Sequence, residues 1–248
     1  MRVLVTGASR GIGKALCKAL LARGHEVRGL SRSLPPGEVA LHVRFRHVPC
    51  DLSDAVSRRE AAERMRKEGF RPDAVVLNAG VEYMEGRERM DWQKAERVLR
   101  TNVDGALFWI AETMPWTTPI QFVGISSILA FRPDADCPAY SASKAALSLA
   151  LRSFRLRFRG TKARFKLLYL GPVHTGINPA FRPDGPLPRG VLPPEEVAEY
   201  LVETVLPSRR EDFYHPCSVA AACRFGGWLP DSLFERITRP FRRKVPPS

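Results

Sequence analysis

The chain has 248 residues, of which 44% are hydrophobic and 26% are charged. This composition excludes a disordered chain, a collagen-like chain and a small domain held together by disulfides, and it is typical of one globular domain. Lysine and arginine number 39 against 26 acidic residues, so the formal net charge is +13. A charge of this sign favours an anionic partner, whether nucleic acid, anionic lipid or a phosphorylated cofactor.

Neither a membrane span nor a metal site is expected. No apolar run approaches the ~20 residues that a spanning helix needs. Met1 leads directly into a strand-like run rather than into a signal peptide. The five cysteines are an odd number and include no CxxC pair. We therefore expect reduced thiols, no bound metal and a cytoplasmic protein.

Strands and helices alternate through the first third of the chain. Apolar runs bounded by turn residues predict strands, and apolar residues at helical spacing predict helices. The strands are expected at residues 2–6, 26–31, 45–49 and 74–77. The helices are expected at 12–23 and at 53–68, the second capped by Ser53. Residues 34–44 are expected to form a loop.

The same alternation continues to about residue 205. Helices are expected at 91–114, 139–158 and 194–205, and strands at 120–126 and 165–170. Repeated β-α-β units with apolar strands predict a parallel sheet covered by helices on both faces, which is an α/β, doubly wound, Rossmann-type fold. We expect one such domain over residues 1–230 and a basic C-terminal extension over 231–248.

A glycine-rich turn, TGASRGIG at residues 6–13, follows the first predicted strand and opens the first predicted helix. Here Gly7 would allow a tight turn, Gly11 would let the backbone approach a pyrophosphate, and Gly13 would let the helix pack closely on the sheet. The start of the helix offers free N–H donors and the positive end of its dipole. A plain tight turn is the alternative, but the placement favours a dinucleotide site.

The end of the second predicted strand indicates which dinucleotide binds. NAD sites usually place Asp or Glu there to accept a hydrogen bond from the ribose 2′-hydroxyl. This chain has Ser31 and Arg32 instead, and Arg10 lies in the glycine turn. Guanidinium groups bind a 2′-phosphate that a carboxylate would repel, so we predict NADP(H). The alternative is that Arg32 is a solvated loop residue.

Tyr140 and Lys144 lie four residues apart near the start of a predicted helix, which puts both side chains on one face. A phenol has an ordinary pKa of ~10, and a nearby ammonium lowers it. A phenol tuned in this way can exchange a proton with a carbonyl or alcohol oxygen. The preceding predicted strand ends at Ser126 and Ser127, at the sheet edge where ligands of such folds bind.

Together these motifs resemble the short-chain dehydrogenase/reductase family. The matches follow the family's order over residues 1–175, and they are residues 6–13, Asp51-Leu52, Asn78-Ala79-Gly80, Asn102, Ser127, Tyr140 with Lys144, and Gly171–Thr175. The resemblance implies that Tyr140 is the general acid/base and that Lys144 binds the nicotinamide ribose and lowers the Tyr140 pKa. It also implies that Ser127, rather than Ser126, hydrogen-bonds the substrate oxygen. Asn102 would support a water leading to Lys144.

The resemblance also implies a set of cofactor contacts. Asp51 would meet the adenine amino group with Leu52 beside it, Asn78 would back the sheet edge near the ribose, and Gly80 would let the cofactor approach. Thr175 would contact the carboxamide, although residues 170–175 (LGPVHT) depart from the family's Pro-Gly pattern. In that turn we expect a structural or solvent role for His174. The full expected set is Gly7, Ser9, Arg10, Gly11, Ile12, Gly13, Ser31, Arg32, Asp51, Leu52, Asn78, Ala79, Gly80, Tyr140, Lys144, Gly171, Val173 and Thr175.

These features predict an NADP(H)-dependent oxidoreductase that transfers hydride between the nicotinamide and a hydrophobic carbonyl or alcohol substrate. Residues 176–192 are interpreted as a lid in which Ile177, Phe181 and Leu187 cover the substrate, or else as an ordinary surface loop. One alternative function is a 3-oxoacyl-[acyl-carrier-protein] reductase, whose acidic partner would suit the net charge. Residues 212–217 do not resemble the C-terminal strand of those reductases. The other alternative is a non-catalytic NADP(H)-binding sensor or scaffold, a type that commonly lacks the Tyr or Lys.

Beyond the substrate, the expected partners are further copies of the chain, as a homodimer or homotetramer. Arg152, Arg155 and Arg159 share one face of a predicted helix. Aromatic residues are not interleaved there as a base-stacking surface requires, so we expect subunit or solvent contacts and no nucleic acid. Residues 231–239 are expected to form a short amphipathic helix, with a basic run at 239–244. We favour packing of this tail on the domain or a second subunit over contact with an anionic membrane.

Overall fold

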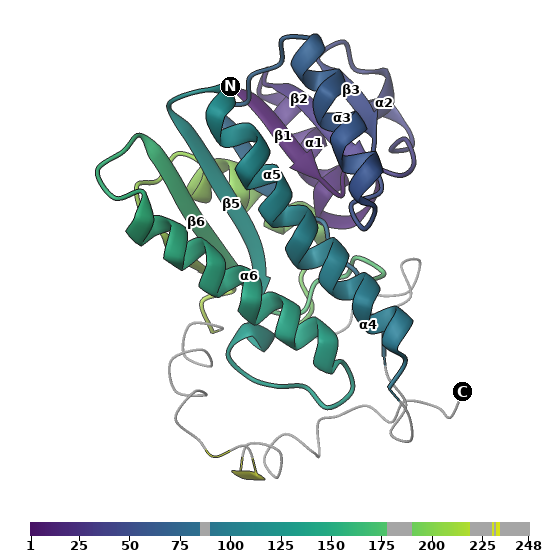
Figure 1. The fold of residues 1–248 in the computed structure, drawn as a ribbon, viewed down its shortest axis with the longest axis vertical. Coiled ribbons are helices and arrows are strands. Elements are labelled where there is room, and N and C mark those ends of the chain that lie inside the picture. Colours follow the sequence, from purple (N-terminus) through teal and green to yellow (C-terminus); the bar gives the residue numbers. More distant parts are fainter. Residues whose placement is uncertain (85–89, 178–189, 219–229, 231, 234–248) are drawn as a thin grey trace.

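A parallel sheet forms the centre of the molecule in the computed structural model, which describes residues 1–84, 90–177, 190–218, 230, 232 and 233 (Figure 1). Seven strands pair in the order β3-β2-β1-β4-β5-β6-β7, and every neighbouring pair is parallel. They are β1 (Arg2–Thr6), β2 (Glu26–Ser31), β3 (Phe45–Pro49), β4 (Ala74–Leu77), β5 (Ile120–Ser127), β6 (Ala163–Leu170) and β7 (Asp212–His215).

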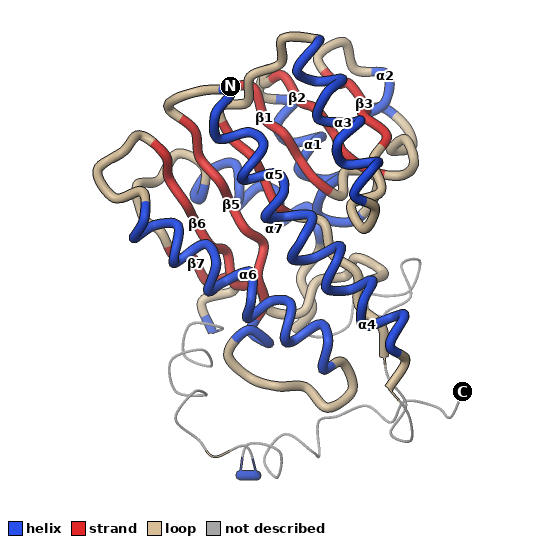
Figure 2. The backbone as a smooth tube through the Cα atoms, in the orientation of Figure 1, coloured by secondary structure: helices blue, strands red, loops and turns tan. Residues whose placement is uncertain are grey.

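Helices lie on both faces of this sheet (Figures 1 and 2). One face is covered by α1 (Gly11–Ala22) and α7 (Pro194–Tyr200), and the other by α3 (Ala55–Lys67), α5 (Gly105–Thr113) and α6 (Pro138–Arg157). Two further helices are α2 (Glu38–Leu41) and α4 (Trp92–Leu99). The arrangement confirms the predicted doubly wound α/β fold in a single domain.

The strands are apolar because both faces of the sheet are buried. In β1, Val3 and Val5 pack in the core layer that contains the α1 residues, whereas Leu4 packs in the opposite layer. Successive side chains of a strand point to opposite faces, so each helical layer receives every second residue. The order of the strands reverses between β1 and β4. In folds of this kind, ligands bind outside the carboxyl ends of the strands at such a point.

Two helix predictions need correction. Helix α2 lies within residues 34–44, where the sequence predicts a loop. Helix α3 is capped by Asp54 rather than by Ser53, because the Asp54 carboxylate accepts hydrogen bonds from the backbone N–H groups of Val56 and Ser57 at 3.1 and 3.2 Å. An ionised carboxylate also suits the positive end of the helix dipole.

The predicted helix at residues 91–114 is a composite. Helices α4 and α5 are joined by a π-helical turn at Arg100–Asp104, and a 3₁₀ turn follows at Met114–Trp116. A second π-helical turn, Leu201–Val205, extends α7. Apolar spacing predicts a helix but does not distinguish an α turn from a wider one, so only the structure shows that Asn102 lies in an irregular turn.

Strand β7 forms in a segment to which the sequence analysis assigns no strand, and Arg155 connects it to the rest of the sheet. The Arg155 guanidinium donates to the carbonyl oxygens of Phe165 and Glu211 at 2.7 and 2.6 Å, and to the Asp212 carboxylate at 2.7 Å. Arg155 therefore binds within its own chain, which corrects the expectation of a subunit or solvent contact.

Lys166 is a buried cation in β6 that satisfies carbonyl groups after α7. Its Nζ atom donates to the Gln121 side chain at 2.7 Å and to the backbone oxygens of Val205 and Leu206 at 2.8 and 2.9 Å. We expect Lys166→Met to lower the free energy of unfolding by about 2–3 kcal/mol, because buried carbonyl oxygens lose their donor. The exposed Lys162→Met is the matched control, with a change within about 0.5 kcal/mol. Urea unfolding measures both, and equal stability of the two variants would contradict this role.

Several predictions fall partly outside the described residues. The described residues include Cys17, Cys50 and Cys137 as buried free thiols and Cys217 as an exposed one. Cys223 lies outside the described residues. Phe181 and Leu187 of the predicted lid and most of the predicted tail helix also lie outside, so the domain boundary near residue 230 stays a prediction. In the part of the chain that is described, no helix has both the length and the apolar character to cross a membrane.

Candidate active site

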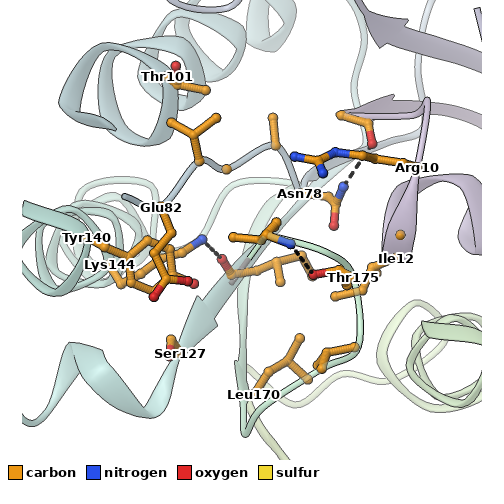
Figure 3. Close-up of a pocket in the computed structure, with 18 of the residues that line it drawn as sticks. Arg10, Ile12, Asn78, Glu82, Thr101, Ser127, Tyr140, Lys144, Leu170 and Thr175 are labelled. Atoms are coloured by element: carbon orange, nitrogen blue, oxygen red, sulfur yellow. Dashed lines mark hydrogen bonds between the residues drawn. The ribbon is translucent and has the colours of Figure 1, made fainter. Parts of the chain in front are cut away.

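A cavity of about 940 Å³ opens at the carboxyl ends of the central strands. One end is bordered by Arg10 in the glycine turn, and the other by Ser127, Tyr140 and Lys144 (Figure 3). The cavity lies where the strand order reverses, at the ligand-binding edge of such sheets. It therefore joins the two sites that the sequence predicts separately.

The glycine turn is shaped by contacts that leave no room for side chains. Gly11 has a φ of 51°, and a Cβ atom there would lie 2.9 Å from the Cβ of Thr175. A Cβ at Gly13 would lie 2.1 Å from the carbonyl oxygen of Gly7. Gly13 thus packs α1 against the turn itself and does not border the cavity, which corrects its expected place among the cofactor contacts. Helix α1 begins without a side-chain cap, so its first N–H groups remain available as donors.

Guanidinium groups gather at the end of the cavity near β2. Arg10 and Arg32 are exposed residues that border it. Arg97, which the sequence analysis does not single out, borders it as well and lies 3.8 Å from the Asp51 carboxylate. Burial alone would raise the pKa of Asp51, but hydrogen bonds from Ser53 and the charges of Arg32 and Arg97 lower it below its usual value. Asp51 is therefore an ionised acceptor within a basic surrounding.

The turn after β4 is tied to the turn after β1. The Asn78 side chain donates to the carbonyl oxygens of Thr6 and Gly7 at 2.9 and 3.3 Å. The Thr6 hydroxyl accepts hydrogen bonds from the backbone N–H groups of Asn78 and Ala79, both at 3.0 Å. These bonds connect the carboxyl ends of β1 and β4 and fix the wall between the two ends of the cavity.

Tyr140 and Lys144 lie one helical turn apart on α6, and both side chains border the cavity (Figure 3). The Lys144 Nζ atom lies 5.4 Å from the centroid of the Tyr140 ring and donates to the carbonyl oxygen of Ile125 at 2.8 Å. The i, i+4 spacing thus produces the expected pair, and β5 supplies the acceptor that orients the ammonium group.

The two serines at the end of β5 differ in what their hydroxyl groups contact. The Ser126 hydroxyl is buried against the Ser148 hydroxyl at 2.7 Å. The Ser127 hydroxyl accepts a hydrogen bond from the backbone N–H of Leu129 at 3.2 Å and lies near the Tyr140 phenol. Ser127 is therefore the serine whose hydroxyl group lies next to the Tyr140 phenol in the cavity.

The pKa of Tyr140 departs from the prediction. Burial raises the pKa of the phenol well above its usual value, the charge of Glu82 raises it further, and hydrogen bonding with Ser127 offsets only part of the rise. Burial also lowers the pKa of Lys144 to about 8. In this structure burial therefore outweighs any lowering of the Tyr140 pKa by Lys144. The phenol keeps its proton at neutral pH.

Asn102 lies behind the cavity rather than on its wall. Its side-chain oxygen accepts a hydrogen bond from the Val81 N–H at 2.8 Å, and its nitrogen donates to the Val81 carbonyl at 3.0 Å and to the Ser143 hydroxyl at 2.9 Å. The Ser143 hydroxyl in turn donates to the backbone oxygen of Tyr140 at 2.7 Å. Asn102 therefore joins the loop after β4 to the helix that carries Tyr140.

The turn after β6 brings Thr175 to the cavity wall despite its unusual sequence. His174 donates its backbone N–H to the Leu192 oxygen at 2.9 Å, and Leu192 donates to the Pro172 oxygen at 2.9 Å. This short parallel contact holds the turn, and Thr175 borders the cavity directly beside Gly11. His174 is not among the residues that border the cavity.

Most of the predicted site residues border this one cavity. They are Gly7, Ser9, Arg10, Gly11, Ile12, Ser31, Arg32, Asp51, Leu52, Asn78, Ala79, Gly80, Ser127, Tyr140, Lys144, Gly171, Val173 and Thr175. Other residues also border it without having been singled out, and these include Cys50, Val81, Glu82, Met84, Arg97, Thr101, Ile128, Leu129, Asp134 and Asp136. No motif or spacing marks this second group, because α4, two helical turns and the ends of several strands bring it together.

Comparison with known proteins identifies the family. Residues 1–185 match the family model for short chain dehydrogenases. An uncharacterized oxidoreductase of Myxococcus xanthus (strain DK1622) is 31% identical over 248 residues, which cover 96% of this chain and 96% of that protein. The chain belongs to the short-chain dehydrogenase family. This dehydrogenase is therefore an oxidoreductase that acts on CH–OH or C=O groups with a nicotinamide coenzyme.

Solved structures share the fold of this dehydrogenase. A short chain dehydrogenase from Burkholderia cenocepacia J2315, in complex with NADP, superposes with a TM-score of 0.81 at 22% identity, covering 95% of this chain and 96% of that chain. A 4-hydroxyisoleucine dehydrogenase complexed with NADH superposes with a TM-score of 0.75 at 18% identity, covering 86% of this chain and 96% of that one. At these identities the likeness concerns the fold alone.

Proposed function

We propose that this dehydrogenase transfers hydride between NADP(H) and a carbonyl or alcohol substrate, with Tyr140 as the general acid/base. One observation carries the proposal. A single cavity holds Tyr140, Lys144 and Ser127 at one end, and the glycine turn with Arg10 and Arg32 at the other. A protein that only sensed or stored the coenzyme would not need a buried proton donor at the far end.

The residues of the cavity fit such a coenzyme. The uncapped start of α1 offers N–H donors to a diphosphate, and Arg10 and Arg32 offer guanidinium groups to a 2′-phosphate. Asp51 is an ionised acceptor for an adenine amino group, and Thr175, whose side chain lies against Gly11, offers a hydroxyl group to a carboxamide. When bound, the coenzyme supplies the hydride.

The chain's own groups handle the proton. In the reduction of a carbonyl, the Tyr140 phenol donates its proton to the oxygen as negative charge develops there, and Ser127 donates a hydrogen bond to the same oxygen. The raised pKa of Tyr140 suits this donor role because the phenol is protonated at neutral pH. Lys144, with a pKa of about 8, is mainly charged there and stabilises the phenolate that forms. Proton transfer of this kind contributes about 10²–10⁴-fold to the rate.

The preference for NADP(H) is supported by the charges near β2. Arg32, and not an acidic residue, comes directly after the Ser31 end of β2. Arg10 and Arg97 border the same end of the cavity. We expect Arg32→Ala to raise the Kd for NADPH by about tenfold or more, because a charge-assisted pair with the 2′-phosphate is lost. The Kd for NADH should stay close to its wild-type value.

Fluorescence titration of both coenzymes measures this preference. Arg59→Ala removes an exposed arginine from α3, away from the cavity, and serves as the charge-matched control. An equal loss of affinity for NADPH and NADH in Arg32→Ala would contradict recognition of the 2′-phosphate by this residue. So would an unchanged affinity for both.

The proposed reaction is tested by NADPH oxidation over a panel of ketones, aldehydes, quinones and acyl thioesters. Val81, Met84, Ile128 and Leu129 border the cavity, so substrates with an apolar portion are expected to react best. A marked preference for acyl thioesters would favour the 3-oxoacyl-[acyl-carrier-protein] reductase alternative. Binding of NADPH without oxidation by any compound would overturn the enzymatic function and favour a sensor or scaffold.

A further inference from the structure

One carboxylate in the cavity has no role in the proton transfer described above. Glu82 lies on the loop after β4, and its carboxyl group lies beside the side chains of Tyr140 and Lys144 (Figure 3). The loop is held in place because Asn102 binds both the N–H and the carbonyl group of Val81. Glu82 is therefore presented to the cavity by a fixed backbone rather than by a free loop.

Among the described residues the Glu82 carboxylate forms no ion pair, and the nearby Lys144 ammonium group acts on it through charge alone. Its described neighbours are the Cys137 thiol, which donates a hydrogen bond to it, and the charges of Asp134 and Lys144 at longer range. Burial raises the pKa of Glu82 above its usual value. A partly buried carboxylate is costly to keep charged unless a cation accompanies it, and a cation bound beside it would offset that cost.

The charges that border the cavity are unevenly distributed. Arg10, Arg32 and Arg97 lie toward the β2 end, where they outnumber the Asp51 carboxylate. At the Tyr140 end the described acidic residues are Glu82, Asp134 and Asp136, and the described cation there is Lys144, whose Nζ atom is already bound to Ile125. The cavity thus changes from basic to acidic along its length, although the chain as a whole has a net charge of +13.

We propose that Glu82 selects substrates that carry a positive charge, such as an ammonium group, close to the reacting carbonyl or carbinol carbon. The apolar remainder of such a substrate packs against Val81, Met84, Ile128 and Leu129. The inference rests on the proposed function, because it takes the reacting oxygen to lie at Tyr140. It goes beyond that function in naming the charge of the substrate and the residue that recognises it.

Two ketones of the same shape test the proposal. One is (2-oxo-2-phenylethyl)trimethylammonium, a permanent cation, and the other is its neutral isostere 3,3-dimethyl-1-phenylbutan-1-one. Isothermal titration into the full-length, NADP⁺-loaded protein gives the Kd of each ketone without any turnover. The wild type should bind the cation at least about tenfold more tightly than the isostere, because one full charge faces Glu82 in a partly desolvated site. Glu82→Gln, which keeps the shape of the side chain, should abolish most of this preference.

Glu60→Gln is the matched control, since it removes the same charge from an exposed position on α3 outside the cavity. It should keep the preference of the wild type. The proposal is overturned if the wild type binds the cation no better than the isostere or not at all, or if the preference persists in Glu82→Gln. Failure of the proposed function is seen separately, as NADPH that binds but is oxidised by no carbonyl compound in the panel.

Discussion

Tyr140→Phe is expected to lower kcat/KM for carbonyl reduction by about 10²–10⁴-fold, because the substrate oxygen loses its proton donor. The ring is retained, so packing in the small apolar cluster with Ala95, Val98 and Ala139 should persist. The Kd for NADPH and the melting temperature should therefore stay close to the wild-type values. NADPH oxidation at saturating coenzyme, with a substrate found in the panel, measures the change.

Tyr200→Phe is the control for this variant. It removes the hydroxyl of another partly buried tyrosine, on α7, which does not border the cavity. Its turnover should match that of the wild type. If Tyr140→Phe reduced carbonyls at the wild-type rate, Tyr140 would not be the general acid, and another group in the cavity would have to supply the proton.

Gly13→Ala is expected to lower both the stability of the fold and the affinity of the coenzyme end of the cavity for NADPH. The new Cβ atom would lie 2.1 Å from the Gly7 oxygen and 2.7 Å from the Asn78 side-chain nitrogen, and the first of these is backbone that cannot rotate away. The glycine turn or the start of α1 must therefore shift. We expect the free energy of unfolding to fall by about 2–4 kcal/mol. The Kd for NADPH should rise at least about tenfold, because the N–H donors move.

Gly37→Ala separates crowding from backbone strain. Gly37 has a φ of 79°, but a Cβ atom there would meet nothing within 4 Å. The remaining cost is the strain of this backbone conformation, which has a ψ of −150° and is essentially restricted to glycine, about 1–3 kcal/mol, and NADPH affinity should not change. Urea unfolding and NADPH titration are compared for the two variants. A Gly13→Ala protein that is as stable as Gly37→Ala, and binds NADPH as the wild type does, would refute the packing described for the glycine turn.

The fold was predictable because the sheet is buried on both faces. Each central strand is an apolar run, and each helix that covers it repeats apolar residues at helical spacing, so both patterns are local. Deviations occur where a single side chain decides the outcome. Asp54 rather than Ser53 caps α3, and Arg155 draws β7 onto β6. Neither choice follows from periodicity. The cap depends on the local backbone geometry at residues 53–57, and Arg155 depends on residues that tertiary packing brings close.

The ends of the cavity were predictable to different degrees. Tyr140 and Lys144 are linked by helical spacing, and the glycine turn by its place between a strand and a helix. Arg97 and Glu82 have no such local signal, since they reach the cavity from α4 and from the loop after β4. The direction of the Tyr140 pKa shift was missed for the same reason. It depends on burial and on the charge of Glu82, which only the assembled site reveals.

In the proposed reaction the Tyr140 phenol faces the reacting oxygen of a substrate beside the coenzyme. A crystal structure of the protein with NADP⁺ and a ketone or alcohol ligand tests it most directly. We expect the ligand oxygen about 2.6–3.2 Å from the Tyr140 Oη atom, with the 2′-phosphate at Arg32. Density for the ligand oxygen away from Tyr140, with the phenol turned out of the cavity, would contradict it.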